Sequence, residues 1–177
     1  MVRTRDAHSG ASARYPRPVQ DDAPQVIQST VDAPWLPPGG VADVVLGGPV
    51  LRPTGLVRLL LTDEDRVFCT RRDGSGKVDL PTARVGAGDH DGAVALAELV
   101  RQVLGGPVPL RYVGAVRNTV TVPTPEYEWP TPVAAFTVWT TDAPPVVPGE
   151  WLAGGADSVL AERHWYPLFR RLVASAH

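Results

Sequence analysis

The sequence predicts an α+β fold built around a mixed β-sheet. Three features of the 177-residue chain lead to this prediction: short apolar runs with strand character, frequent turn signals between them, and two segments in which apolar residues recur at helical spacing. Their order is strands, helix, strands, helix, which is typical of the α+β class. At 44% hydrophobic residues, the chain has enough material for the core of one domain, with a tail to spare.

The N-terminal part of the chain is predicted to differ from the rest. Residues 1–24 are polar and show no periodicity, so we expect a disordered leader. Residues 25–50 contain apolar pairs between Pro- and Gly-rich breaks, and we expect an extended segment that Trp35 packs onto the domain. The domain itself is predicted to span residues 51–177.

The first half of this domain reads as strands followed by a loop. Apolar runs at 54–62 and 66–71 flank the turn at 63–65, which predicts a β-hairpin. A turn rich in Gly follows, and 77–80 is predicted to be a short strand that Pro81 ends. Residues 82–91 are expected to form a loop.

A helix is predicted over residues 91–104. Asp89 or Asp91 can cap its start, and Gly105 follows its last apolar residue. The apolar residues of this segment recur every three or four positions and so share one face; they are Ala93, Leu96, Ala97, Val100, Val103 and Leu104.

The second half of the domain adds strands and a closing helix. Residues 109–122 are predicted to hold one or two strands, and the alternating segment 133–141 another. Pro-rich loops are expected at 123–132 and 142–149. From about residue 155 to the end we expect helix, because Trp165, Leu168, Phe169 and Leu172 follow the spacing of a helix packed on a sheet.

Composition excludes several classes of protein. The net charge of −2 excludes a nucleic-acid-binding protein that relies on bulk positive charge. Cys69 is the lone cysteine, which excludes an intramolecular disulfide and a multi-cysteine metal site; we expect it in the core. No apolar stretch suits a membrane helix or a signal peptide, so a soluble, cytoplasmic protein is expected. Arginine has GC-rich codons, so the excess of Arg over the single Lys77 indicates a bacterial source with a GC-rich genome.

The segment VRLLLTDEDRVFCTRRDGSGKVDLPTARVGAGDHDGAVALAELVRQVLGG resembles the Nudix hydrolases. Strands, a Leu-Pro pair, a loop and a helix of matching length follow in the family's order, and the tail EWLAGGADSVLAERHWYPLFRRL is similar to the closing helices of bacterial members. The likeness covers about residues 55–174. It implies an α/β/α sandwich around a mixed sheet, and hydrolysis of a diphosphate linked to another group with the help of Mg²⁺.

The family's motif is only partly present. With the alignment anchored on Leu80-Pro81, its paired glycines fall on Thr82 and Ala83, and its arginine falls on Ala97. Glu98 keeps the first helix glutamate, and Asp89 stands where a loop glutamate is expected. The paired glutamates that complete the family's metal site are Arg101 and Gln102 here, and the closing glycine is Leu104.

The resemblance makes Glu98 the catalytic candidate and Glu98 with Asp89 the candidate ligands of Mg²⁺. Positions 98, 101 and 102 share one helix face, on which Arg101 cannot bind a metal and would repel a cation. Glu98 and Arg101 can equally form a surface ion pair, and Asp89 can be a helix cap. Arg101 is also a candidate contact for a ligand phosphate.

Further candidates lie at strand ends and in loops. Arg72 and Arg117 are candidate substrate-binding residues; the alternative is a solvated strand end for Arg72 and a turn at a strand end for Arg117. Tyr127 and Trp129 can stack on a base or pack the loop onto the core. His90 is the histidine nearest to the candidate metal site; it can act as a base or be solvated.

Three functions remain open at this point. The first is a divergent Nudix-fold protein that binds a nucleotide or another phosphorylated small molecule, with hydrolysis weak or lost. The second is an active hydrolase that cleaves a nucleoside diphosphate linked to another group, with further ligands from Glu126 or Glu128. The third is a structural partner protein that binds through its leader. Family members often form dimers, so the resemblance allows a homodimer, and no membrane partner is expected.

Overall fold

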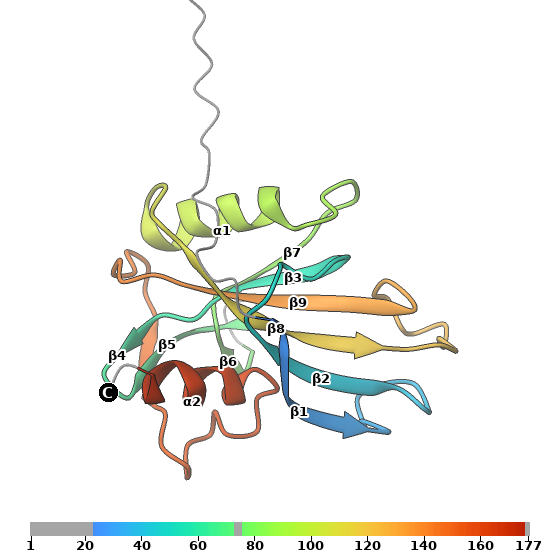
Figure 1. Ribbon diagram of the computed structural model, residues 1–177. Helices are drawn as coiled ribbons and strands as arrows, with labels where there is room; N and C mark the ends of the chain where they lie inside the picture. Colours follow the sequence, from blue (N-terminus) through green and yellow to red (C-terminus); the bar gives the residue numbers. More distant parts are fainter. Residues whose placement is uncertain (1–22, 73–75, 176–177) are drawn as a thin grey trace, which may run out of the picture.

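The computed structural model describes residues 23–72 and 76–175. Residues 1–22 of the predicted leader lie outside this range. The elements follow in chain order (Figure 1): β1 (Gln25–Val31), β2 (Val41–Leu46), β3 (Thr54–Leu59), β4 (Thr62–Asp63), β5 (Arg66–Arg71), β6 (Val78–Asp79), β7 (Thr82–Arg84), α1 (Ala93–Leu104), β8 (Arg111–Thr119), β9 (Val133–Thr140), β10 (Glu150–Ala153) and α2 (Tyr166–Ala174).

A six-stranded sheet in the order β1-β2-β8-β9-β3-β7 forms the centre of the molecule. β3 runs parallel to β9, and every other neighbouring pair in this sheet is antiparallel, so the sheet is mixed. α1 and α2 lie on opposite sides of it (Figure 1). The predicted α+β fold, with a mixed sheet between helices, is confirmed. The segment 25–50, predicted to be extended, supplies β1 and β2 of the main sheet.

A smaller sheet in the order β10-β5-β4 corrects the predicted hairpin of 54–62 with 66–71. Most of the first run is β3, which pairs with β9 and β7. The Leu60 backbone N–H still donates to the Trp139 carbonyl at 2.8 Å, which holds the chain beside β9 up to that residue. Beyond this point the chain turns to β5: Thr62 and Asp63 pair with it, and the Phe68 N–H donates to the Leu61 carbonyl at 3.0 Å.

Two other predictions of secondary structure were wrong in part. The expected loop 82–91 begins with β7, which pairs with the edge of β3. The helix expected from about residue 155 begins only at Tyr166, after successive turns, and β10 precedes those turns. Pro167 in the first turn of α2 explains the late start, because proline suits the first turn of a helix and breaks a helix interior.

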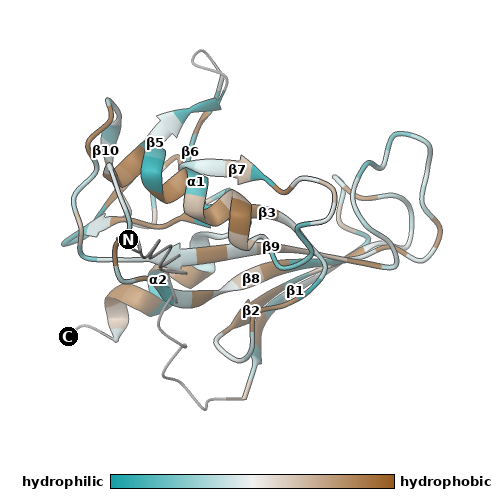
Figure 2. Cartoon of the chain, turned by 90° about the horizontal axis from the view of Figure 1, so that it is seen from above, coloured by the Kyte–Doolittle hydropathy of each residue, from teal (hydrophilic) through white to brown (hydrophobic). Residues whose placement is uncertain are grey.

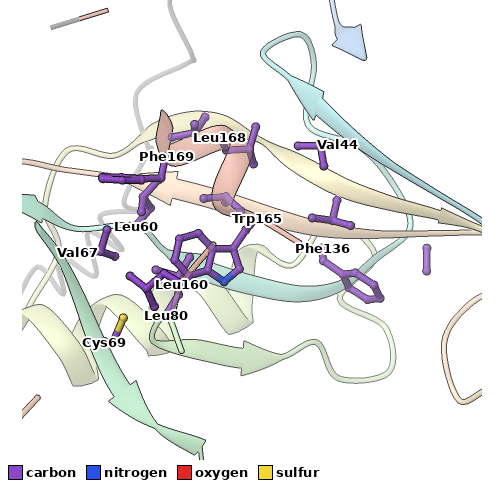
Figure 3. Close-up of a cluster of buried hydrophobic side chains, with 14 residues drawn as sticks. Val44, Leu60, Val67, Cys69, Leu80, Phe136, Leu160, Trp165, Leu168 and Phe169 are labelled. Carbon is purple, nitrogen blue, oxygen red and sulfur yellow. The ribbon is translucent and has the colours of Figure 1, made fainter. Parts of the chain in front are cut away.

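The two faces of the main sheet carry two hydrophobic clusters. On β3, Val57 and Leu59 face the cluster that includes α1, whereas Leu56 faces the cluster that includes α2, as strand alternation requires. α1 carries hydrophobic and hydrophilic residues along its length, as its spacing predicted (Figure 2). Trp165 and Phe169 are buried in the cluster that includes α2, as predicted (Figure 3).

Cys69 belongs to the same cluster as Trp165 and Phe169 and is completely buried (Figure 3). Its expected place in the core is confirmed. No helix in the described ranges is both long and apolar enough to cross a membrane.

Candidate functional site

The solvent face of α1 carries the catalytic candidate Glu98. Its carboxylate accepts hydrogen bonds from Arg101, with Nε at 2.9 Å, and from Gln102, with Nε2 at 2.7 Å. These hydrogen bonds, that from Arg101 first, lower the pKa of Glu98 below its usual value. Both oxygens of Glu98 are thus already bound by side chains of its own helix, one of them cationic. Glu98 and Arg101 therefore form an exposed ion pair on one face of the helix, as their spacing of three residues allows.

Asp89, the second metal candidate, binds the N-terminus of α1. Its two carboxylate oxygens accept the backbone N–H groups of Val94 at 3.2 Å and Ala95 at 2.9 Å. Asp91 accepts the N–H of Ala93 at 3.2 Å and pairs with Arg52 at 3.0 Å. These carboxylates therefore satisfy the free amides at the helix start and complement its dipole.

Glu98 and Asp89 do not suit a Mg²⁺ ion, which needs free carboxylate oxygens and is repelled by a neighbouring cation. Glu98 is bound to a guanidinium, and Asp89 is bound to amides. Within residues 23–72 and 76–175, no three His, Cys, Asp or Glu side chains lie together so as to hold a metal ion.

The three candidate substrate-binding arginines lie in three separate places. Arg101 is on the outer face of α1. Arg117 binds Asp43 of the neighbouring strand β2, with Nη2 at 2.6 Å from Oδ2. It points away from the sheet face to which its neighbour Asn118 belongs, because side chains alternate along β8. Arg72 alone of the three lines a large cleft.

This cleft, of about 730 Å³, lies on the face of the main sheet that α2 also covers. Strands β3, β5, β7, β8 and β9 contribute to it, together with the segment between β1 and β2, the 120–132 loop and the turn before α2. Its walls combine aromatic rings with arginines, an amide and a phenol. No sequence pattern brings these elements together, so the sequence did not predict the cleft.

Arg58 is the buried arginine of the cleft. It is 7% exposed, and its Nε and Nη1 atoms have no hydrogen-bond partner within the described part of the chain. The guanidinium lies 5.7 Å from the centre of the Phe136 ring. Burial lowers the pKa of Arg58 to about 10, against the opposing charge of Asp79, so Arg58 is protonated at neutral pH. A buried cation without a contacting carboxylate is costly unless an anion binds it.

The other cleft arginines are each held by a carboxylate. Arg72 pairs with Asp79, and Arg71 pairs with Glu150 at 3.0 Å. Arg84 pairs with Glu128 at 2.8 Å. Arg58 thus differs from its neighbours in having a charge that no described side chain neutralises by contact.

Asp79 organises the wall beside Arg58. Its carboxylate accepts the Leu80 backbone N–H at 2.8 Å, the Trp165 indole N–H at 2.7 Å, and a hydrogen bond from Arg72. Burial raises the pKa of Asp79, but the charge of Arg58 and the hydrogen bonds outweigh it, and the pKa lies below its usual value. Asp79 is therefore ionised and ties Arg72 to the core.

The candidate residues of the 120–132 loop, Tyr127 and Trp129, also line the cleft. Trp129 packs edge-on against Phe136, with ring centres 5.0 Å apart. Tyr127 lies near Asn118; burial raises the pKa of its phenol, and the Asn118 amide opposes that rise. His90 and Asp89 line a separate pocket of about 300 Å³ between the 85–90 loop and Trp129.

One feature of the sequence could have identified Arg58 as a candidate: it is the single charged residue inside the apolar run 54–62. Trp35 and His164, which also line the cleft, had no such feature, because they come from segments far apart in the chain.

No family model and no curated protein matches this chain. Among solved structures, it is similar to a mutant of the Bacillus subtilis pyrophosphohydrolase BsRppH, with a TM-score of 0.43 and 14% sequence identity. The match covers 70% of this chain and 68% of that chain. A likeness of this size does not bear on the activity of this chain.

Proposed function

We propose that the chain binds a phosphorylated small molecule, such as a nucleotide, in the large cleft, and that Mg²⁺-dependent hydrolysis is weak or lost. The observation that carries this proposal is Arg58, a buried cation that lines the cleft without a contacting carboxylate. Its planar guanidinium suits the paired oxygens of a phosphate, which it can bind through two hydrogen bonds. A cleft of about 730 Å³ is within the usual range for small-molecule sites.

Loss of hydrolysis is supported by the state of the two metal candidates. The carboxylate of Glu98 is compensated by Arg101, and that of Asp89 caps α1. Neither residue lines the large cleft. In this proposal Arg72 is a second phosphate contact, whereas Arg101 and Arg117 lie outside the binding site.

An active hydrolase remains the second candidate, and one observation favours it. Glu126 and Glu128 of the 120–132 loop both line the cleft, so carboxylate oxygens are present in the same cleft as the proposed phosphate site. In that case these two glutamates, rather than Glu98 alone, would hold a divalent cation. Glu128 would first have to leave Arg84.

Calorimetric titration tests the binding proposal. Pyrophosphate and nucleoside 5′-diphosphates are titrated into the full chain, once with Mg²⁺ and once with a chelator. We expect binding without metal, and Arg58→Met to weaken it about 10- to 100-fold, because charge-assisted hydrogen bonds are lost. Arg58→Lys keeps the charge but not the planar fork, and should recover part of the affinity.

Arg101→Gln serves as the matched control, because Arg101 is paired and lies outside the cleft. It should bind like the wild type. Equal affinity in the wild type and in Arg58→Met, with both folded by circular dichroism, would refute the binding proposal. Mg²⁺-dependent release of phosphate that Glu98→Gln or Glu126→Gln abolishes would establish the hydrolase instead.

A further inference from the structure

Two tryptophans line the large cleft, and they differ in what covers their rings. The Arg84 guanidinium carbon lies over the Trp129 ring, 4.5 Å from its centre, and Phe136 meets the same ring edge-on. Gly55 lies close to the ring, since a Cβ at Gly55 would be 2.9 Å from a Trp129 carbon. Trp129 is therefore packed by the protein itself, and a ligand ring would have to displace those contacts.

Trp35 is open by comparison. It is 44% exposed, although it lines the cleft. One face of its indole stacks on His164, with ring centres 3.8 Å apart and planes inclined by 20°. The ring also contributes to the lining of the cleft. A large aromatic side chain that is partly uncovered in a cleft is typical of a small-molecule binding site.

Two features hold Trp35 in place: the hydrogen bonds of its own segment and the His164 ring on which it stacks. Its segment between β1 and β2 is closed by a hydrogen bond from the Gly39 N–H to Asp32 at 2.9 Å and by one from the Leu36 N–H to the Ala33 carbonyl at 2.8 Å. Behind the ring, burial and then the charge of Arg58 lower the pKa of His164. The imidazole is therefore neutral at pH 7 and meets Trp35 as a flat, uncharged ring.

We propose that Trp35, supported by His164, stacks on a planar ring of a ligand whose phosphate binds at Arg58. This inference rests on the proposed function, and it narrows the ligand to a phosphate ester that carries an aromatic or heteroaromatic ring. Arg58, Trp35 and His164 line the same cleft, so one molecule can make both contacts. Stacking of this kind tolerates many rings, because every aromatic base offers a flat face.

Paired probes separate the ring contact from the phosphate contact. The four common nucleoside 5′-monophosphates carry a base, whereas ribose 5-phosphate carries the same sugar and phosphate without one. Each is titrated by calorimetry into the full wild-type chain and into Trp35→Leu, Trp35→Phe and Arg58→Met. Trp151→Leu is the control, because Trp151 is 37% exposed but does not line the cleft.

We expect at least one nucleotide to bind the wild type more tightly than ribose 5-phosphate does. Trp35→Leu should weaken the binding of that nucleotide about 5- to 100-fold and leave the affinity for ribose 5-phosphate unchanged. Trp35→Phe should restore most of the affinity, Trp151→Leu should have no effect, and Arg58→Met should weaken both kinds of probe.

The outcomes that contradict the two proposals differ. If the wild type binds all probes equally, or if Trp35→Leu weakens nucleotides and ribose 5-phosphate alike, the stacking role is refuted while phosphate binding at Arg58 stands. If no probe binds the wild type, or if Arg58→Met leaves every affinity unchanged, the proposed function itself fails. Equal melting temperatures of the variants exclude a folding defect as the cause.

Discussion

At the scale of single residues, the arginines of the cleft differ in whether a carboxylate contacts them. Arg58 is buried without a contacting carboxylate, whereas Asp79 receives three hydrogen-bond donors. Asp79 is 1% exposed and supplies the opposing charge that Arg58 feels. An anion at Arg58 would therefore complete a charge balance that the protein leaves open.

Asp79→Asn is expected to lower the free energy of unfolding by about 2–3 kcal/mol, because Arg58 and Arg72 lose their buried counter-charge. The folded-state pKa of Asp79 is depressed, so its contribution is fully present above the usual value of 3.8 and is lost as the pH falls below it. Urea denaturation at pH 7 and at pH 3 measures both effects. The deficit of Asp79→Asn should shrink at pH 3.

Asp63→Asn is the matched control, since Asp63 pairs with Arg66 at the surface and is half exposed. Its effect at pH 7 should be close to zero. A deficit of Asp79→Asn that stays constant between the two pH values would contradict the assigned role of the Asp79 charge.

At the scale of secondary structure, α1 is a well-capped amphipathic helix. Asp89 and Asp91 bind its first amides, and Gly105 ends it in a left-handed conformation, with φ of 79°. Its buried face packs on β3 and β7, and its outer face carries Glu98. The acidic residues near this helix therefore have structural roles that do not require a metal.

Asp89→Ala should lower the free energy of unfolding by about 1 kcal/mol, the usual cost of a lost helix cap. Asp89→Asn keeps an acceptor oxygen and should cost less. Urea denaturation with and without Mg²⁺ measures the difference. A loss of stability that appears only in the presence of Mg²⁺ would identify Asp89 as a metal ligand instead.

At the scale of the whole molecule, the N-terminal segment is part of the sheet and part of the cleft. β2 pairs with β8 along its length, and Val44 and Val45 of β2 are buried. The segment between β1 and β2 supplies Trp35 to the cleft wall. The boundary predicted at residue 51 therefore separates residues that pack together in the structure. The homodimer that the family resemblance allows stays a prediction.

A chain of residues 51–177 is expected not to fold cooperatively. Removal of β1 and β2 would leave one edge of β8 unpaired and would expose apolar residues of the cluster beneath α2. Thermal unfolding followed by circular dichroism tests this, with the full chain as reference. A sharp unfolding transition in the shortened chain would show that residue 51 is a true domain boundary.

The sequence by itself determined the features that depend on near neighbours in the chain. Helical spacing located α1 and the buried face of α2, and strand alternation located β9. The replacement of two expected glutamates by Arg101 and Gln102 was also visible, and the structure shows both bound to Glu98. These signals are local, because a helix or strand repeats its own period regardless of its partners.

Only the tertiary structure decided which strands are neighbours and what lies between them. The parallel pairing of β3 with β9 places Arg58 on the cleft face of the sheet, and the packing of distant segments brings Trp35 onto His164. No local period encodes these contacts, since they depend on the order of strands in the sheet and on which faces the helices cover. The cleft, and with it the site proposed for a ring-bearing phosphate, therefore could not be located from the sequence.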